Sequence, residues 1–458
     1  MRLVMKFGGT SVGSVEGVKR VSELVKLHSD QELVVVVSAM GDTTDRLIEA
    51  ARLMEGGKRR EGEAKVRELE GMHHPILEAI DPKVREGVRK KLSSLFEELR
   101  MVLTGVYLLR ELTPRSMDLI LSFGERLSTT LVHGSLKGLG LNVRMLTGGE
   151  AGIVTDSNFG EARPLIEATY HQVRRRLGPM LKKGVIPVVT GFIAADQDGA
   201  TTTLGRGGSD YTATLIGAAI DADEVWLWSD VDGLMSADPR MVKGARPLKS
   251  VSYEEAIEMA AFGVKGMHPR ALEPVMEKGI PVRIRNTFNP DFEGTVIGKG
   301  SEGGTVKAVA MVKGVGLITV SGAGMVGMPG VAARIFGVLA SRGINIRMIS
   351  QSVSESNISM IVSAKDLYRA ANALELELLG GRFVKQVETE EGLCVVAVIG
   401  SGMKYKPGIA ARVFGAVARR GINVRMIAQG SSENNISFVV KEEDGEEAVR
   451  ALHEEFNL

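Results

Sequence analysis

The sequence has one cysteine and few aromatic residues, and its charges nearly cancel. Cys394, in the apolar run LCVVAV, has no partner for a disulfide, which is typical of a reducing compartment. Lys and Arg number 57 against 56 Asp and Glu, so a net charge of +1 favours neither nucleic acid nor an anionic membrane as partner. No apolar stretch approaches the roughly 20 residues of a membrane helix, and the opening MRLVMKFGG is too polar for a signal peptide. We therefore expect a cytoplasmic protein.

The 458 residues exceed what one hydrophobic core usually organises. In the N-terminal part, short β-rich runs alternate with helical stretches, and a Gly-rich stretch after about residue 294 ends the pattern. The runs are residues 3–7, 33–37, 143–146, 185–190, 224–228 and 282–285. This alternation predicts an α/β domain over residues 1–296, with a mostly parallel sheet between helices.

The C-terminal part repeats itself at a distance of 78 residues. Of the 43 residues from Val320 to Val362, 26 are identical to their partners from Val398 to Val440. Each copy has the pattern strand, helix, two strands and helix, which predicts two ferredoxin-like α+β units at residues 306–388 and 389–458. The second copy lacks a closing strand, so we expect residues 306–311 to complete it and the two copies to interlock.

The unusual residues of the first domain follow the predicted strands. They lie at residues 6–11, 38–45, 190–192 and 229–233. Ligands of open parallel sheets bind outside the carboxyl ends of the strands, so these four segments are expected to meet at one edge.

Two glycine-rich segments at this edge predict an anion site. Lys6 stands beside Gly8 and Gly9, where the backbone can approach a phosphate. A tight turn with a surface lysine would have the same sequence pattern and remains an alternative. The run TLGRGGSDYTA places three glycines before a helix whose first turn carries Ser209 and Asp210. Asp210 is also suited to capping that helix. The spacing fits neither the Walker pattern nor the protein kinases.

Six motifs together give a specific resemblance. Their order and spacing resemble the aspartate kinases of the amino-acid-kinase family, and the C-terminal repeats resemble the paired ACT domains of that family. The motifs are MKFGGTSVGS, VVVVSAMGDTTD, SFGERLS, TTLGRGGSDYTA, SDVDGLMSADPR and FGVKGMHP. The resemblance implies the transfer of a phosphoryl group from ATP to the 4-carboxylate of L-aspartate, the first step toward lysine, threonine, methionine and isoleucine.

The resemblance also implies roles for single residues. Lys6 would contact the transferring phosphate and Asp210 would orient Lys6, as the two catalytic residues. Glu125 would receive the ammonium of the substrate and Arg206 a carboxylate, and the full substrate set is Ser38, Thr44, Glu125, Arg206 and Ser209. The implied nucleotide set is Lys6, Gly8, Gly9, Thr10, Ser11, Ser229, Asp230, Arg240 and Lys265.

This chemistry explains why no histidine motif is needed. A β-carboxylate with a pKa near 3.9 is ionised at neutral pH and attacks phosphorus without a general base. The remaining task is to hold two anions in line and to neutralise charge, which calls for lysine, backbone donors and Mg²⁺ carried with ATP. We expect ATP and Mg²⁺ as cofactors and no metal site built from protein side chains.

The repeats imply regulation by an end-product amino acid. By resemblance, the effector is lysine or threonine, and the residues expected to meet it are Met325, Gly330, Gln351, Asn357 and Ser359. Exposed strand edges of ACT domains pair side by side, which implies a homodimer or a dimer of dimers. That the repeats only dimerise remains an alternative.

Two other functions remain open from the sequence alone. One is another phosphotransferase of the family, acting on glutamate, carbamate or a nucleotide. The other is a non-catalytic amino-acid sensor with a decayed kinase domain. Because the chain ends with the second repeat, we expect no fused homoserine dehydrogenase.

Overall fold

The hydrophobic runs of the N-terminal part form the parallel strands of one sheet. The computed structural model describes residues 1–264, 267–300, 304–381, 383–430 and 433–458. They form two compact units. The first comprises residues 1–234, 249–253 and 265–301, and the second comprises residues 235–248, 254–264 and 302–458.

The sheet of the first unit has the strand order β3-β5-β2-β1-β8-β10-β11-β9. The first six strands in this order run parallel, β11 is antiparallel to β10, and β9 is parallel to β11. Their bounds are β1 Arg2–Phe7, β2 Glu32–Val37, β3 Val143–Leu146, β5 Ile186–Thr190, β8 Glu224–Ser229, β9 Ser250–Ser252, β10 Val282–Asn286 and β11 Thr295–Gly298. The prediction of a mostly parallel sheet is confirmed, and its six parallel strands are the six predicted runs.

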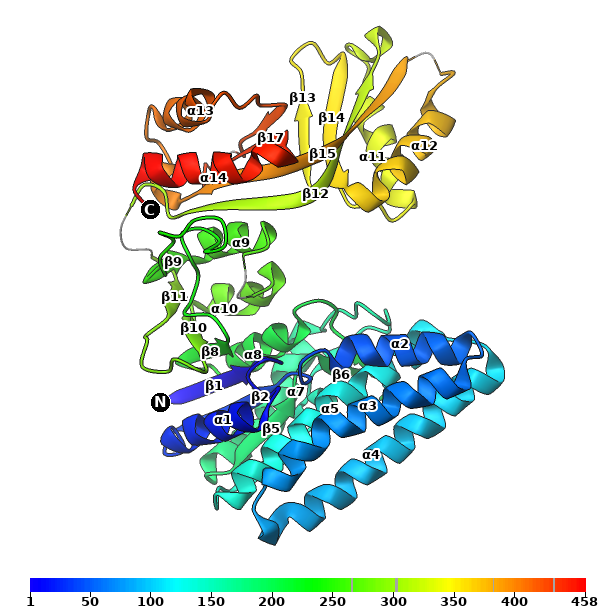
Figure 1. Ribbon diagram of the computed structural model, residues 1–458, viewed down its shortest axis with the longest axis vertical. Helices are drawn as coiled ribbons and strands as arrows, with labels where there is room; N and C mark the ends of the chain where they lie inside the picture. Colours follow the sequence, from blue (N-terminus) through cyan, green and yellow to red (C-terminus); the bar gives the residue numbers. More distant parts are fainter. Residues whose placement is uncertain (265–266, 301–303, 382, 431–432) are drawn as a thin grey trace. The chain divides into compact units, whose positions relative to one another are not determined.

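Helices cover both faces of this sheet (Figure 1). On β1, Leu3, Met5 and Phe7 join the core formed with α1 to α5, whereas Val4 faces α8, close to Gly217. The helices are α1 Val15–Leu27, α2 Thr43–Glu55, α3 Arg59–Ala79, α4 Pro82–Leu109, α5 Pro114–Gly138, α6 Gly148–Ala151, α7 Ile166–Lys182, α8 Gly208–Ala219 and α10 Glu273–Lys278. A strand alternates its side chains between two faces, so strands buried on both sides are nearly continuous in apolar residues.

Short polar signals set where the long helices begin. The side chains of Asp81 and Thr113 accept hydrogen bonds from backbone N–H groups in the first turns of α4 and α5. In both helices a proline follows the cap, at a position where its missing N–H costs nothing.

A small sheet in the first unit was not predicted from the sequence. Its order is β4-β6-β7, with bounds Val154–Thr155, Ile193–Asp196 and Thr201–Thr203. Strands of two to four residues are too short to establish an alternating pattern.

The second unit contains a six-stranded antiparallel sheet of order β13-β14-β12-β15-β17-β16. Its strands are β12 Ala308–Ser321, β13 Met348–Gln351, β14 Asn357–Ser363, β15 Gln386–Ile399, β16 Met426–Ala428 and β17 Asn435–Lys441. The helices of the two repeats are α11 Val331–Ser341, α12 Leu367–Leu378, α13 Ile409–Arg419 and α14 Glu442–Phe456. The predicted α+β class of both repeats is confirmed.

Two long strands are shared between the repeats, as Figure 1 shows for β12 and β15. The first part of β12, residues 308–312, pairs with residues 395–399 of β15 and so extends the second repeat. The last part of β12, residues 317–321, pairs with residues 386–390 of β15 and so extends the first. The boundary expected between residues 388 and 389 therefore falls inside β15.

The expected domain of residues 1–296 is continuous in sequence, but the compact units are not. Residues 235–248 and most of α9 (Tyr253–Ala261) belong to the second unit. Within that unit, Val309 N donates to the Ser236 carbonyl at 2.8 Å, and Ser236 Oγ lies 3.0 Å from His453 Nε2. Such contacts join distant parts of the chain and leave no pattern in the local sequence.

Candidate active site

The loops after the parallel strands are tied together by backbone hydrogen bonds. Gly8 N donates to the Trp228 carbonyl at 3.0 Å, and Gly41 N donates to the Gly9 carbonyl at 3.1 Å. The loop after β5 joins them, since Gly191 N donates to the Val37 carbonyl at 2.8 Å. The four strand ends therefore form one rim.

The first loop keeps the backbone of β1 close to its neighbours. Ser11 Oγ lies 2.7 Å from Thr287 Oγ1 and is buried, whereas Thr10 is exposed at the rim. A Cβ atom on Gly9 would lie 2.7 Å from the Ala39 carbonyl oxygen, and one on Gly8 would lie 3.4 Å from the Trp228 carbonyl oxygen. Gly9 is thus the tighter position.

Gly9→Ala is expected to reduce activity strongly, because the new methyl group pushes the first loop away from the Ala39 backbone. A misplacement of about 1 Å costs on the order of 10²-fold in rate. Gly87→Ala, on α4 with nothing within 4 Å of the added Cβ, is the matched control and should keep full activity. Steady-state kinetics of both variants check this, and equal activities would contradict the tight approach.

Lys6 and Asp210 form an ion pair across the rim. Lys6 Nζ lies 2.5 Å from Asp210 Oδ1, and the two side chains are only 12% and 11% exposed. Asp210 lies in the first turn of α8, whose preceding residue Gly207 adopts a left-handed conformation with φ of 73°. The pair places a partly desolvated ammonium at the end of β1 and beside the amino end of a helix.

Glu125 is a buried acid on α5 with an unused oxygen. Its side chain is 3% exposed, and Oε1 accepts a hydrogen bond from Ala39 N at 3.0 Å. Among the residues that the structure describes, Oε2 has no hydrogen-bond partner. Burial raises the pKa of Glu125 to about 8, against the Ala39 N–H and the charge of Lys6, which lower it. The site thus holds a buried carboxyl group whose ionised form would be favoured by a bound cation.

The remaining substrate residues expected from the sequence lie at the same rim. The Ser38 carbonyl accepts from Ser128 Oγ at 2.6 Å, and Ser38 N donates to the Phe7 carbonyl at 3.1 Å. Thr44 is half-buried in the first turn of α2. The backbone of Ser38 is thus fixed by these hydrogen bonds, and the side chains of Ser38 and Thr44 are partly exposed.

Arg206 and Ser209 belong to the loop that leads into α8. Arg206 is exposed and stands between Gly205 and Gly207, both with positive φ. Ser209 packs against Gly191, where an added Cβ would lie 2.6 Å from the serine side chain. The arginine side chain is therefore exposed to solvent, whereas the serine is held by close packing.

The nucleotide residues expected at the end of β8 are present at the rim, with partners that the sequence did not suggest. Ser229 is half-buried and Asp230 is exposed. Beside them, Asp232 Oδ1 accepts hydrogen bonds from Asn286 Nδ2 at 2.8 Å and Asn289 Nδ2 at 3.0 Å. These bonds hold the SDVDG loop against the end of β10.

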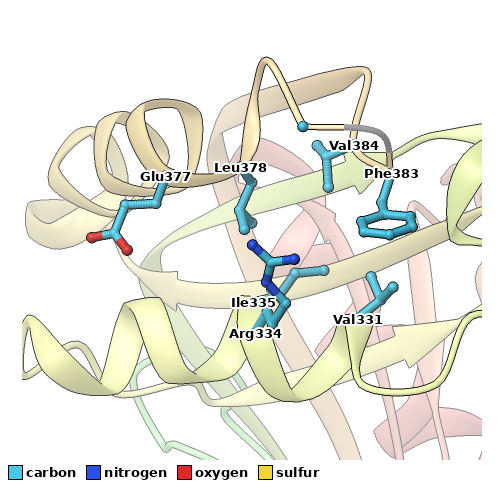
Figure 2. Close-up of a pocket in the computed structure, with 8 residues that line it drawn as sticks. Val331, Arg334, Ile335, Glu377, Leu378, Phe383 and Val384 are labelled. Atoms are coloured by element: carbon cyan, nitrogen blue, oxygen red, sulfur yellow. The ribbon is translucent and has the colours of Figure 1, made fainter.

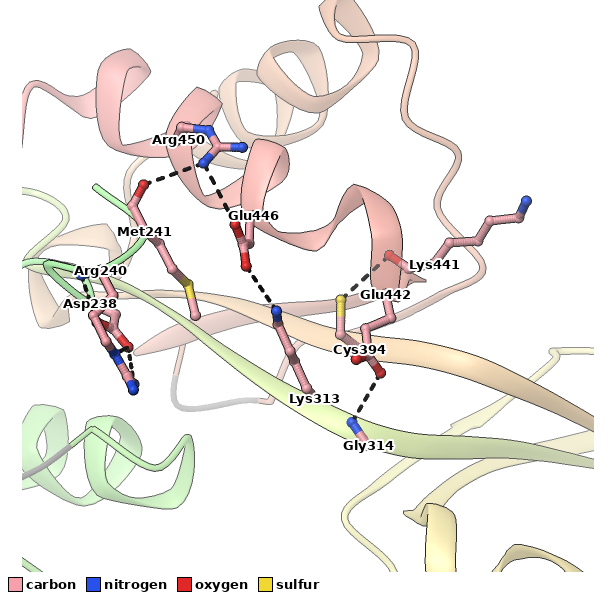
Figure 3. Close-up of polar contacts among 10 residues, drawn as sticks. All are labelled: Asp238, Arg240, Met241, Lys313, Gly314, Cys394, Lys441, Glu442, Glu446 and Arg450. Atoms are coloured by element: carbon pink, nitrogen blue, oxygen red, sulfur yellow. Dashed lines mark hydrogen bonds and ion pairs between the residues drawn. The ribbon is translucent and has the colours of Figure 1, made fainter. Parts of the chain in front are cut away.

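The other two expected nucleotide residues are Arg240 and Lys265. Arg240 belongs to the second unit, where it is 81% exposed on its side chain and pairs with Asp238 at 2.6 Å (Figure 3). Lys265 lies outside the described residues. The nucleotide roles of both stay predictions.

Asp118 was missed by sequence reasoning although it organises the loop before α8. Its buried carboxylate accepts from Gly160 N at 3.0 Å, Thr203 N at 2.9 Å and Thr203 Oγ1 at 2.7 Å. Burial raises the pKa of Asp118, and these hydrogen bonds oppose the rise. An acid inside the apolar face of a helix is the signal that could have identified it.

His268 was also missed and stands beside the loop of Arg206. A Cβ on Gly207 would collide with the His268 side chain, so the glycine allows their close approach. Burial lowers the pKa of His268, and Arg206 and Arg270 lower it further. A neutral imidazole therefore lies next to the candidate carboxylate-binding arginine.

Within the described ranges, no three His, Cys, Asp or Glu side chains gather as a metal site. Besides Glu125, the carboxylates at the rim are Asp210, which pairs with Lys6, and Asp230 and Asp232, which follow β8. Magnesium is commonly held by nucleotide phosphates with one or two carboxylates, so these residues fit a metal that arrives with the nucleotide.

Every helix in the described part of the chain is too short or too polar to cross a bilayer.

In the second unit, three of the five expected effector residues line one cavity. A space of about 330 Å³ is lined by Gln351, Asn357 and Ser359 of the first repeat and by residues 424–427 of the second. Met325 is buried in the turn before α11, and Gly330 caps that helix with φ of 88°. These two shape the turn and do not line the cavity.

A second, smaller cavity lies between α11 and α12 in the first repeat. Figure 2 shows its apolar side chains, with Arg334 and Glu377 contributing charged groups. Its volume is about 120 Å³, and none of the five expected effector residues lines it.

Comparisons with known proteins agree with this arrangement. Residues 1–286 match the amino acid kinase family, and residues 318–378 and 396–456 each match an ACT domain. Aspartokinase 1, chloroplastic, of Arabidopsis thaliana is 34% identical over 464 residues, which cover 99% of this chain and 80% of the relative.

Two crystal structures are similar over the whole chain. E. coli aspartokinase III in complex with aspartate and ADP, in the R-state, has a TM-score of 0.87 at 32% identity and 100% coverage of both chains. The same enzyme in complex with lysine and aspartate, in the T-state, has a TM-score of 0.81 at 32% identity and 99% coverage of both.

Proposed function

This chain belongs to the amino acid kinase family and is an allosterically regulated aspartate kinase, and from this premise we propose how its residues divide the work. The reaction converts ATP and L-aspartate to ADP and 4-phospho-L-aspartate. We assign the chemistry to residues 1–296 and amino-acid sensing to the repeats of residues 306–388 and 389–458.

The Lys6–Asp210 ion pair is the observation that carries the assignment. It joins the end of β1 to the first turn of α8, 2.5 Å apart, although the residues are far apart in sequence. In this proposal Lys6 neutralises charge on the transferring phosphoryl group, and Asp210 holds the ammonium in place. The backbone N–H group of Gly9 and those at the start of α8 supply further donors.

Glu125 and Arg206 select the substrate in this proposal. The unused Oε2 of Glu125 accepts the aspartate ammonium, and the planar guanidinium of Arg206 binds the α-carboxylate. Ser38, Thr44 and Ser209 position the same molecule. The β-carboxylate then attacks phosphorus in its ionised form, so no side chain has to remove a proton.

The nucleotide enters as its magnesium complex. Thr10 and Ser11 shape the phosphate loop, Ser229 and Asp230 lie at the end of β8, and Arg240 and Lys265 are proposed for the nucleotide side. Because Mg²⁺ keeps several waters and binds phosphate oxygens, few protein ligands are required. The metal supplies charge neutralisation between the phosphates when it is bound.

Regulation is proposed for the first repeat. Gln351, Asn357 and Ser359 line a polar cavity, and the related E. coli aspartokinase III has been crystallised with lysine. We propose lysine or threonine as effector, a homodimer or a dimer of dimers through the ACT repeats, and a cytoplasmic location.

The activity is tested by coupled ADP release from the purified protein with ATP and aspartate. Glutamate replaces aspartate as the control, because its longer side chain misplaces the reacting carboxylate while keeping both charged groups. Turnover with aspartate and almost none with glutamate is expected. Equal rates would contradict the roles of Glu125 and Arg206. Titration with lysine and threonine, separately, then identifies the effector.

A further inference from the structure

The two repeats have the same backbone turn before their first helix. Gly322 N donates to the Ser356 carbonyl at 2.9 Å, and Gly400 N donates to the Asn434 carbonyl at 2.9 Å. At the repeat distance of 78 residues, residue 322 corresponds to residue 400 and residue 356 to residue 434. Differences between the turns therefore come from what surrounds them.

The turn of the second repeat binds a carboxylate of the chain itself. Ser401 N and Ser401 Oγ each donate to Glu255 Oε1 at 2.7 Å. One helical turn further along α9, Glu258 accepts a hydrogen bond from Asn435 Nδ2. Glu255 is 0% exposed, so its charge is removed from water and held by these donors.

The corresponding positions of the first repeat are open. Ala323 corresponds to Ser401 and is exposed, and Asn357 corresponds to Asn435 and is half-buried. Within the described residues, no carboxylate is hydrogen-bonded to Ala323 N or to the Asn357 side chain. Within the part of the chain that the structure describes, a carboxylate thus binds the turn of the second repeat and none binds that of the first.

We propose that the second repeat has a carboxylate-binding site at Ser401 and Asn435, and that α9 fills it with Glu255 and Glu258 as an internal ligand. Asn357 is one of the residues proposed above to meet the effector, so the filled site is the duplicate of a regulatory site. That comparison rests on the proposed function, whereas the occupancy by Glu255 does not.

Tethering explains why the internal carboxylates exclude a free amino acid. A group on the same chain acts at an effective concentration in the millimolar range. Its binding also avoids the loss of translational and rotational freedom that a separate molecule undergoes on binding. A free amino acid must displace two hydrogen-bonded carboxylates to enter. We therefore expect the turn of the second repeat to bind α9 and not a free amino acid.

Hydrogen exchange of the full chain without ligand is the direct test. Backbone amides of residues 400–404 should be protected by the bound Glu255, whereas those of 322–326 should exchange at least about tenfold faster. Adding lysine or threonine should protect residues 322–326 and leave 400–404 unchanged. Equal exchange of the two peptides in the ligand-free protein would overturn the proposal, whether or not the protein proves to be an active kinase.

Chemical rescue distinguishes a binding site from a merely structural contact. Glu255→Ala removes a group of the size of acetate, so exchange at residues 400–404 should rise about tenfold and acetate should restore protection where chloride does not. Glu254→Ala, an exposed neighbour on α9, is the matched control and should change neither. Unchanged exchange in Glu255→Ala, or faster exchange that acetate cannot reverse, would refute the site.

Discussion

Replacing Lys6 with alanine is expected to lower kcat by roughly 10² or more, the loss that follows removal of one donor aimed at developing charge. The KM for aspartate should change little, because the ammonium is proposed to act on the phosphoryl group in the transition state and not on the amino acid. Coupled ADP release at saturating ATP and aspartate measures the effect.

The same substitution leaves Asp210 without its ion-pair partner, so folding must be checked separately. Thermal unfolding of Lys6→Ala and of Lys6→Met, which keeps the length of the side chain, shows whether the loss of rate is chemical. Lys19→Ala, on the exposed face of α1, is the matched control and should retain wild-type turnover. A folded Lys6→Ala enzyme with near-normal kcat would remove Lys6 from the mechanism.

Glu125→Gln is expected to raise the KM for aspartate by roughly tenfold to a hundredfold, which corresponds to one lost hydrogen bond between charged groups. In the wild-type protein the carboxyl must lose its proton before it can accept the ammonium of aspartate. Because its pKa is raised to about 8, the KM for aspartate should fall as the pH rises toward about 8. Glutamine cannot ionise, so the variant should lack this component of the pH profile.

The pH dependence of stability is an independent test of the raised pKa of Glu125. Its folded-state pKa of about 8 exceeds the ordinary value of 4.5, so between these pH values the folded state holds a proton that the unfolded state has released. Stability should therefore decrease as the pH rises through this window, and Glu125→Gln should remove that decrease. Glu97→Gln, on the exposed side of α4, serves as the control. Identical pH dependences of unfolding in wild type and Glu125→Gln would contradict the raised pKa.

The rim of the active site was predictable because it follows from strand ends. Lys6 directly precedes the end of β1, so the rule for parallel sheets brings it to this edge. Asp210 instead follows β7 of the small sheet, and its pairing with Lys6 was implied by the family resemblance. The glycines carried further information, since Gly9 and Gly207 stand where a side chain would collide. Local sequence was sufficient for Lys6 and for these glycines.

Other features depend on contacts that no local pattern records. The raised pKa of Glu125 follows from its burial, which the segment GERLS does not reveal. Glu255 reads as an ordinary residue of an amphipathic helix, yet it is buried against Ser401, 146 residues away. Arg240 was assigned by resemblance to the nucleotide, but its visible partner is the neighbouring Asp238.

The pairing of β12 with β15 affects when the regulatory unit can fold during its synthesis on the ribosome. Residues 308–312 emerge early but have no neighbour on that side until residues 395–399 have been synthesised. Residues 308–312 of the nascent chain consequently stay unpaired on that side while residues 313–394, which hold the rest of the first copy, are translated. A nick between the copies would yield two fragments that each complete their sheets only by reassociating with the other.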